Sequence, residues 1–86
     1  MNKVWTENAW QDYIDWQTED RNTLKKINRL IEDVSRNGNN GIGKPEPLVG
    51  ELIGFWSRRI DETNRLVYKT DSQNIYILSC RYHYHK

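Results

Sequence analysis

The chain is divided near its middle by a stretch that cannot continue a helix. Residues 37–41 read Asn-Gly-Asn-Asn-Gly, and residues 44–48 contain two prolines. Glycine and asparagine end helices, and a proline keeps the residue before it out of helical geometry. We therefore expect helices before this break, strands after it, and no regular structure in residues 44–48.

The first half predicts a short strand followed by two helices. Residues 3–5 favour an extended start, and Thr6 is a suitable N-cap for the first helix. Asp20 or Asn22 can cap the second helix. That helix carries one apolar stripe at helical spacing, with acidic and basic residues on its other side: Leu24, Ile27, Leu30, Ile31 and Val34. We expect its charged side to be a solvated face, because an RNA-binding helix would not carry so many acids.

The second half predicts three strands joined by short turns. The candidate strands are residues 52–60, 65–69 and 74–82. The connections 61–64 and 71–73 have hairpin length and turn composition. The predicted fold class is therefore α+β: β-α-α followed by an antiparallel meander, with two helices packed on one face of a small twisted sheet. The other face would be open and polar, and residues 1–86 would form a single domain.

Composition limits the classes of function. Cys80 is the only cysteine, so no intramolecular disulfide can form, and its apolar neighbours favour a buried, inert thiol. No apolar run approaches the roughly 20 residues that a membrane span needs. The first residues lack a signal-peptide pattern. We therefore expect a cytoplasmic protein with no membrane contact.

The net charge of +1 is far from the strongly basic footprint of many nucleic-acid binders. The distribution is more informative than the total. Residues 44–86 hold seven basic and five acidic side chains, and their arginines are clustered: Arg58, Arg59, Arg65 and Arg81. Any tight binding of RNA would have to depend on shape or on a larger target surface.

Glu46 lies between two prolines. Pro45 and Pro47 restrict the backbone on either side, so the carboxylate would be held in place before a ligand arrives. This arrangement suits a general base. The residues alone, however, favour an ordinary surface turn.

The arginines offer a candidate phosphate site. Arg59 would face the open side of the sheet, and Arg65 would join it if the hairpin loop holds an odd number of residues. Two guanidiniums on one face can bind a phosphate and stabilise charge that develops on it. They can equally pair with nearby acids. Arg58 would share the helical side with Trp56 and would have to pair or snorkel.

The C-terminal segment alternates aromatic and imidazole side chains between basic residues: Arg81-Tyr82-His83-Tyr84-His85-Lys86. Imidazole titrates near neutrality, so His83 can donate or accept a proton. Tyrosine rings stack on unpaired bases, which makes Tyr82 and Tyr84 candidate RNA contacts. We expect no metal at His83 and His85, because no cysteine or carboxylate cluster completes such a site.

Four motifs resemble the YoeB toxins within the RelE-like superfamily, and the likeness covers essentially the whole chain. They are Gly43-Lys44-Pro45-Glu46-Pro47-Leu48, Gly54-Phe55-Trp56-Ser57-Arg58-Arg59-Ile60, Arg65-Leu66-Val67-Tyr68 and Cys80-Arg81-Tyr82-His83-Tyr84. Their order and separations make the resemblance specific. Two features depart from it: Val49 stands where many relatives carry a lysine, and His85-Lys86 extends the chain past Tyr84.

The resemblance implies a compact RelE-like microbial-ribonuclease fold and the toxin of a type II toxin–antitoxin system. It implies a homodimer, a YefM-type antitoxin and mRNA cleavage in the A site of the 70S ribosome, with no metal or cofactor. The implied catalytic residues are Glu46 as general base, His83 as general acid, Arg65 for the phosphate and Tyr84 for stacking. The implied RNA contacts are Lys44, Arg58, Arg59 and Tyr82.

Two alternatives use the same residues. One is a non-catalytic inhibitor that binds RNA or the ribosome, and the other is a ribonuclease that needs no ribosome. The combination of Glu46, Arg65 and His83 favours catalysis over binding alone. The weak net charge argues against efficient capture of free RNA.

Overall fold

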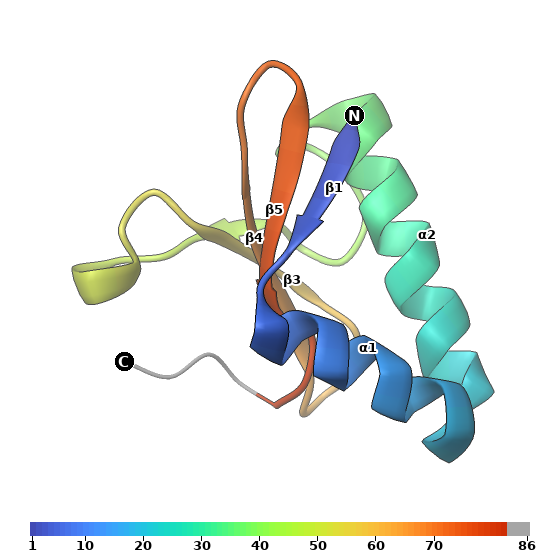
Figure 1. Ribbon diagram of the computed structural model, residues 1–86. Helices are drawn as coiled ribbons and strands as arrows, with labels where there is room; N and C mark the ends of the chain where they lie inside the picture. Colours follow the sequence, from blue (N-terminus) through green and yellow to red (C-terminus); the bar gives the residue numbers. More distant parts are fainter. Residues whose placement is uncertain (83–86) are drawn as a thin grey trace.

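The computed structural model describes residues 1–82 and places two helices along one face of a five-stranded sheet (Figure 1). The predicted α+β class is confirmed. The elements in chain order are β1 (Asn2–Trp5), α1 (Glu7–Glu19), α2 (Arg21–Asn37), β2 (Glu46–Pro47), the 3-10 turn η1 (Gly50–Leu52), β3 (Trp56–Arg59), β4 (Arg65–Thr70) and β5 (Asn74–Ser79). The strand order is β1-β5-β4-β3-β2, in which only the β1–β5 pair is parallel.

Local side chains fix both helix starts as the sequence predicted. The Thr6 hydroxyl accepts a hydrogen bond from the N–H of Ala9 at the start of α1. The Asp20 carboxylate accepts from Asn22 and Thr23 at the start of α2, so Asp20 is the cap rather than Asn22. Such caps satisfy backbone donors that have no partner within the helix. The helix α2 ends at Asn37 and is capped by Gly38, whose φ of 60° is a conformation that glycine adopts readily.

The apolar stripe of α2 packs against the sheet. The core cluster joins side chains of both helices, of β4 and β5, and of the residues just after β3 and β5: Ala9, Trp16, Ile27, Leu30, Ile31, Val34, Ile60, Leu66, Tyr68, Ile75, Ile77 and Cys80. Burial raises the pKa of the Cys80 thiol to about 12. The predicted burial of Cys80 is therefore confirmed, and a thiol with so high a pKa is protonated at neutral pH.

Two predictions about the strands were wrong. Residues 52–60 do not form one strand, because Gly50 and Gly54 have φ angles of 70° and 97° and the chain forms η1 before β3 begins at Trp56. Figure 1 shows η1 projecting away from the helices. Residues 44–48, expected to be irregular, contain β2, which pairs with Trp56 and Ser57. The strand β2 lies at the sheet edge, where a proline without an N–H is tolerated.

The sheet face away from the helices is less open than predicted. Ser57 and Val67 point to this face, yet they are only 3% and 0% exposed. The sequence also did not predict the parallel pairing of β1 with β5, which joins the two ends of the described chain.

Arg58 lies in the interior, which contradicts its predicted role in RNA binding. Its side chain is fully buried, and its Nη1 lies 2.5 Å from the Asp33 carboxylate of α2. The same guanidinium donates to the carbonyls of Gly38 and Ile42 and to the Tyr68 hydroxyl. Arg58 faces the helices because it alternates with the outward-facing Ser57 and Arg59. It ties the end of α2 and the following loop to β3.

The loop between α2 and β2 packs so closely on the Arg58–Asp33 ion pair that a side chain at Gly41 should disturb this pair. A Cβ atom there would lie 1.6 Å from the Asp33 carboxylate and 2.8 Å from the Arg58 guanidinium. We expect Gly41→Ala to destabilise the protein by roughly 1–3 kcal/mol, the usual cost of overpacking. Urea unfolding would measure it, with the exposed neighbour Asn40→Ala as control. Equal midpoints for the two variants would contradict the close packing.

Candidate active site

The strand register brings three of the predicted site residues to one face of the sheet. Glu46 of β2 pairs with Ser57 of β3, and Arg59, two residues further along β3, pairs with Arg65 of β4. Paired residues share a face, and so do residues two apart on one strand. Five residues separate Arg59 from Arg65, which meets the condition of an odd loop. The carboxylate and both guanidiniums therefore lie on the face opposite the helices.

Arg65 is held by the backbone of its own hairpin. Its Nη1 donates to the carbonyls of Asp61 at 2.7 Å and Asn64 at 3.1 Å. Within residues 1–82, the ion pairs are Arg58–Asp33 and Arg81–Glu19, so no carboxylate of that part contacts the Arg65 guanidinium directly, although the nearby Asp61 carboxylate attracts it. A guanidinium fixed by neutral carbonyls keeps its charge for an anionic ligand.

The same hairpin anchors the end of the described chain. The N–H of Arg65 donates to the carbonyl of Tyr82 at 2.9 Å, and the N–H of Tyr82 donates to the Asn64 side chain at 2.6 Å. Asn64 in turn donates to the Asp61 carboxylate. Burial acts to raise the pKa of Asp61, but hydrogen bonds from Asn64 and Thr63 outweigh it and leave the pKa below its ordinary value. The anionic Asp61 therefore orients Asn64.

Sequence reasoning missed Asn64. In residues 61–64 the sequence predicts only that Asn and Asp form a turn. The spacing of Asp61 and Asn64 is a signal for a side-chain-stabilised turn, but nothing in it indicates the contact with Tyr82, which lies 18 residues away.

The helix α1 anchors the chain just after β5. The Asp12 carboxylate accepts from the N–H of Cys80 at 3.1 Å, and the Trp16 indole donates to the carbonyl of Cys80 at 2.9 Å. The Arg81 guanidinium lies 4.3 Å from the centre of the Trp16 ring and pairs with Glu19. The strand ends at Ser79, and Tyr82 has a φ of 60°. The chain has therefore left strand geometry before His83, as expected.

The remaining predicted site residues have different placements. Lys44 is exposed and shares a surface cavity of about 350 Å³ with Arg59 and Lys26. Gly43, whose carbonyl accepts from the N–H of Arg59, precedes Lys44. Tyr82 is exposed at the end of the described chain. His83 and Tyr84 lie outside the described residues, as do His85 and Lys86.

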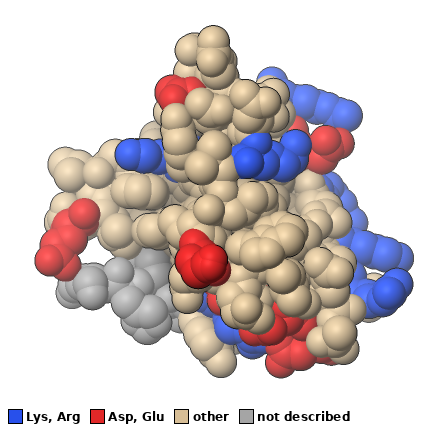
Figure 2. All heavy atoms as spheres, in the orientation of Figure 1, with Lys and Arg blue, Asp and Glu red and all other residues tan. Residues whose placement is uncertain are grey.

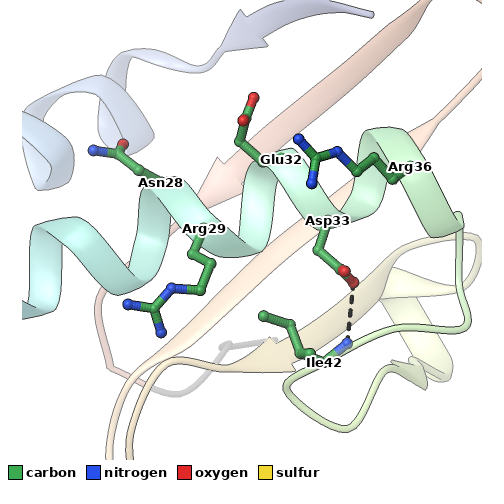
Figure 3. Close-up of a pocket in the computed structure, with 6 residues that line it drawn as sticks. All are labelled: Asn28, Arg29, Glu32, Asp33, Arg36 and Ile42. Atoms are coloured by element: carbon green, nitrogen blue, oxygen red, sulfur yellow. Dashed lines mark hydrogen bonds between the residues drawn. The ribbon is translucent and has the colours of Figure 1, made fainter.

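The outer side of α2 carries a second cluster of charges. Figure 2 shows basic side chains along the edge of the molecule where α2 lies. A cavity of about 580 Å³ there is lined by Asn28, Arg29, Glu32, Asp33, Arg36 and Ile42 (Figure 3). The hydrogen bond from the N–H of Ile42 to Asp33 closes one side of it. Glu32 can offset only one of the two arginines, because the Asp33 carboxylate is already paired with Arg58.

Two further properties of the described residues bear on the chemistry. No group of three or more metal-ligating side chains occurs within residues 1–82. In the same part of the chain, neither helix is long and apolar enough to cross a membrane. The sheet face opposite the helices carries a carboxylate that can accept a proton and two guanidiniums that can bind a phosphate.

Comparison with known proteins identifies the family. Residues 5–84 match the model of the YoeB-like toxin of bacterial type II toxin–antitoxin systems. Toxin YoeB of Streptomyces coelicolor is 51% identical over 84 residues, which cover 98% of this chain and 100% of that protein. A YoeB dimer and a heterotetrameric YoeB–YefM complex, both from Staphylococcus aureus, superpose with a TM-score of 0.92. Each is 46% identical, and each match covers 98% of both chains.

The two helices on a five-stranded sheet define a RelE-like toxin fold. Within this class, the chain belongs to the YoeB-like toxins of bacterial type II toxin–antitoxin systems.

Proposed function

We propose that this chain is a ribosome-dependent endoribonuclease that cleaves mRNA in the A site of the 70S ribosome and so inhibits translation. The observation that carries the proposal is the placement of Glu46, Arg59 and Arg65 on one sheet face. RNA supplies its own nucleophile, the 2′-hydroxyl beside the scissile phosphate. Glu46 takes the proton of this hydroxyl, and the two arginines stabilise the charge that develops on the phosphate. This chemistry requires neither a metal nor a cofactor.

The remaining roles come from the resemblance to the family. His83 protonates the departing 5′-oxygen, and Tyr84 stacks on a base and orients it. Support comes from the anchoring of Tyr82, the residue before His83, to Arg65 and Asn64. Lys44 and Tyr82, both exposed, add RNA contacts.

The proposal includes two protein partners and a cytoplasmic location. An acidic segment of a YefM-type antitoxin would pair with Arg59 and Arg65, cover the active face and become ordered on binding. The Staphylococcus aureus relatives support this partner and a homodimer, since one is a YoeB–YefM complex and another a YoeB dimer. The whole chain would act as one domain.

Parallel reactions with programmed ribosomes and with naked mRNA, followed by mapping of the RNA ends, test the function. We expect cleavage within the A-site codon only when ribosomes are present. Translation that stops without any cut would instead indicate a non-catalytic inhibitor. Equal cleavage of naked RNA would indicate a general ribonuclease.

Asn64 is expected to act as a positioning residue. Asn64→Ala removes the acceptor for the N–H of Tyr82, so the chain leading to His83 loses one of its anchors. We expect cleavage on programmed ribosomes to slow by roughly 10-fold, since small misplacements in an active site cost up to about 100-fold. The Michaelis constant should change little. Thr63→Ala, an exposed change in the same turn, is the control. A rise in the Michaelis constant with unchanged turnover would contradict the role.

A further inference from the structure

A lysine between two aromatic rings lies on the same face as the candidate active site. The ammonium of Lys69 is 5.1 Å from the centre of the Phe55 ring and 5.7 Å from that of Tyr76. Lys69 is exposed, whereas both rings are half-buried. Aromatic faces attract a cation without neutralising it. The two rings therefore restrict where the ammonium lies and leave its charge in place.

Carboxylates of the described chain do not neutralise this ammonium either. Neither of the two ion pairs within residues 1–82 involves Lys69. Asp71 lies on the same hairpin, but its carboxylate accepts from the Tyr76 hydroxyl at 2.6 Å and from the N–H groups of Gln73 and Asn74. Lys69 thus presents a positioned positive charge that no acid in this part of the chain neutralises.

The sheet register places Lys69 and Arg65 on opposite sides of the cross-strand row that contains Glu46. Glu46, Ser57 and Val67 form one cross-strand row, since Glu46 pairs with Ser57 and Ser57 with Val67. Arg65 lies two residues before Val67 on β4 and Lys69 two residues after it. The row that contains Glu46 therefore runs between the arginines and the lysine. The Cα atoms of Arg65 and Lys69 are roughly 13 Å apart along the strand, so the two side chains start from different points along this face.

We propose that Lys69, positioned by Phe55 and Tyr76, binds a backbone phosphate of the mRNA close to the scissile one. This inference rests on the proposed function. With the scissile phosphate at Arg59 and Arg65 and the 2′-hydroxyl over Glu46, the RNA chain extends along β4 toward Lys69. A lysine ammonium binds phosphate as a compact point charge, and such a contact is independent of base sequence.

Single charge deletions in the RNA test this contact directly. Synthetic mRNAs carry one neutral methylphosphonate at each position around the A-site codon except the scissile one, and each is cleaved on programmed ribosomes. We expect one position at which neutralisation slows the wild-type protein by roughly 10-fold, the usual scale for a charged hydrogen bond. Lys69→Ala should show a similar loss on unmodified mRNA and no further loss at that position.

Three variants complete the design. Lys69→Arg keeps the charge and should retain most of the rate. Phe55→Leu removes one ring and should show a smaller loss at the same phosphate. Lys25→Ala removes an exposed lysine of α2, away from this face, and should behave as wild type.

Each outcome decides the inference. If the wild-type protein cleaves mRNA, and each methylphosphonate slows Lys69→Ala as much as it slows the wild type, the contact is wrong and the proposed function stands. If Lys69→Ala cleaves normally but resists neutralisation by the antitoxin, the lysine contacts protein rather than RNA, and the inference is overturned. If the wild-type protein cleaves no mRNA, both proposals fail.

Discussion

Replacing Arg65 with alanine is expected to slow mRNA cleavage by roughly 10²–10³-fold while ribosome binding stays close to that of the wild type. Removal of one preorganised donor from a developing negative charge costs about 2.7–4 kcal/mol in well-studied cases. Arg65 meets the condition of preorganisation, because two backbone carbonyls hold its Nη1. The loss should appear in turnover, since the interaction strengthens only as the phosphate gains charge.

Single-turnover cleavage and ribosome co-sedimentation separate the two effects. Arg29→Ala, which removes an exposed arginine of α2, is the matched control. Arg65→Lys retains a charge without the planar fork and should recover only part of the rate. If binding and turnover fall in parallel, Arg65 docks the ribosome and does not stabilise the reacting phosphate.

The helical half of the fold was predictable because its signals are local. The Thr6 and Asp20 caps lie within three residues of the N–H groups that they satisfy. The apolar stripe of α2 repeats with the period of the helix, and its buried members face the sheet. Such patterns can be recognised from neighbouring residues alone, without any contact between distant parts of the chain.

The errors in the second half come from backbone conformation and long-range pairing. Residues 52–60 look like one strand in composition, but the positive φ angles of Gly50 and Gly54 are set by the loop that forms η1. The pairing of β1 with β5 joins segments about 70 residues apart, so neither segment indicates it alone.

The sequence predicts part of the candidate site, because the number of residues in a hairpin loop decides which side chains share a sheet face. Once β3 and β4 pair across an odd loop, Arg59 and Arg65 must share a face. The position of Glu46 on that face depends on β2, which was expected to be irregular. Its placement therefore came from the structure rather than from the sequence.

Arg58 shows why the role of a charged residue on the buried sheet face is hard to predict from sequence. Alternation along β3 placed it correctly on the helical side, and the sequence required it to pair or snorkel. Its partner, Asp33, lies 25 residues earlier on another element. Because the sequence does not indicate that Asp33 is the partner, it cannot distinguish a buried, paired arginine from one that binds RNA.

Arg58→Ala is expected to lower the free energy of unfolding by about 3–5 kcal/mol, the usual cost of removing one partner of a buried ion pair. The variant also leaves the carbonyls of Gly38 and Ile42 without their donor. For a domain of this size, the unfolding midpoint should fall by about 12 °C or more. Arg36→Ala, on the exposed side of α2, should leave the midpoint almost unchanged.

Acid titration of stability gives an independent measure of the same pair. The hydrogen bond from Arg58 is the largest cause that holds the pKa of Asp33 below its ordinary value of 3.8. A carboxylate with a lowered pKa stabilises the fold above the unfolded-state pKa, and this stabilisation is lost as the pH falls through the folded-state value. Arg58→Ala should therefore show a flatter loss of stability below about pH 4 than the wild type.

The double variant Arg58→Met with Asp33→Ala distinguishes two causes of instability in Arg58→Ala: the unpaired charge of Asp33 and the lost packing of the Arg58 side chain. Replacement of both charges by apolar groups is often close to neutral, so the double variant should be more stable than Arg58→Ala. It should also retain cleavage activity, because neither residue lies on the face that carries Glu46 and Arg65. A folded double variant that no longer cleaves RNA would place Arg58 in the RNA-binding surface after all.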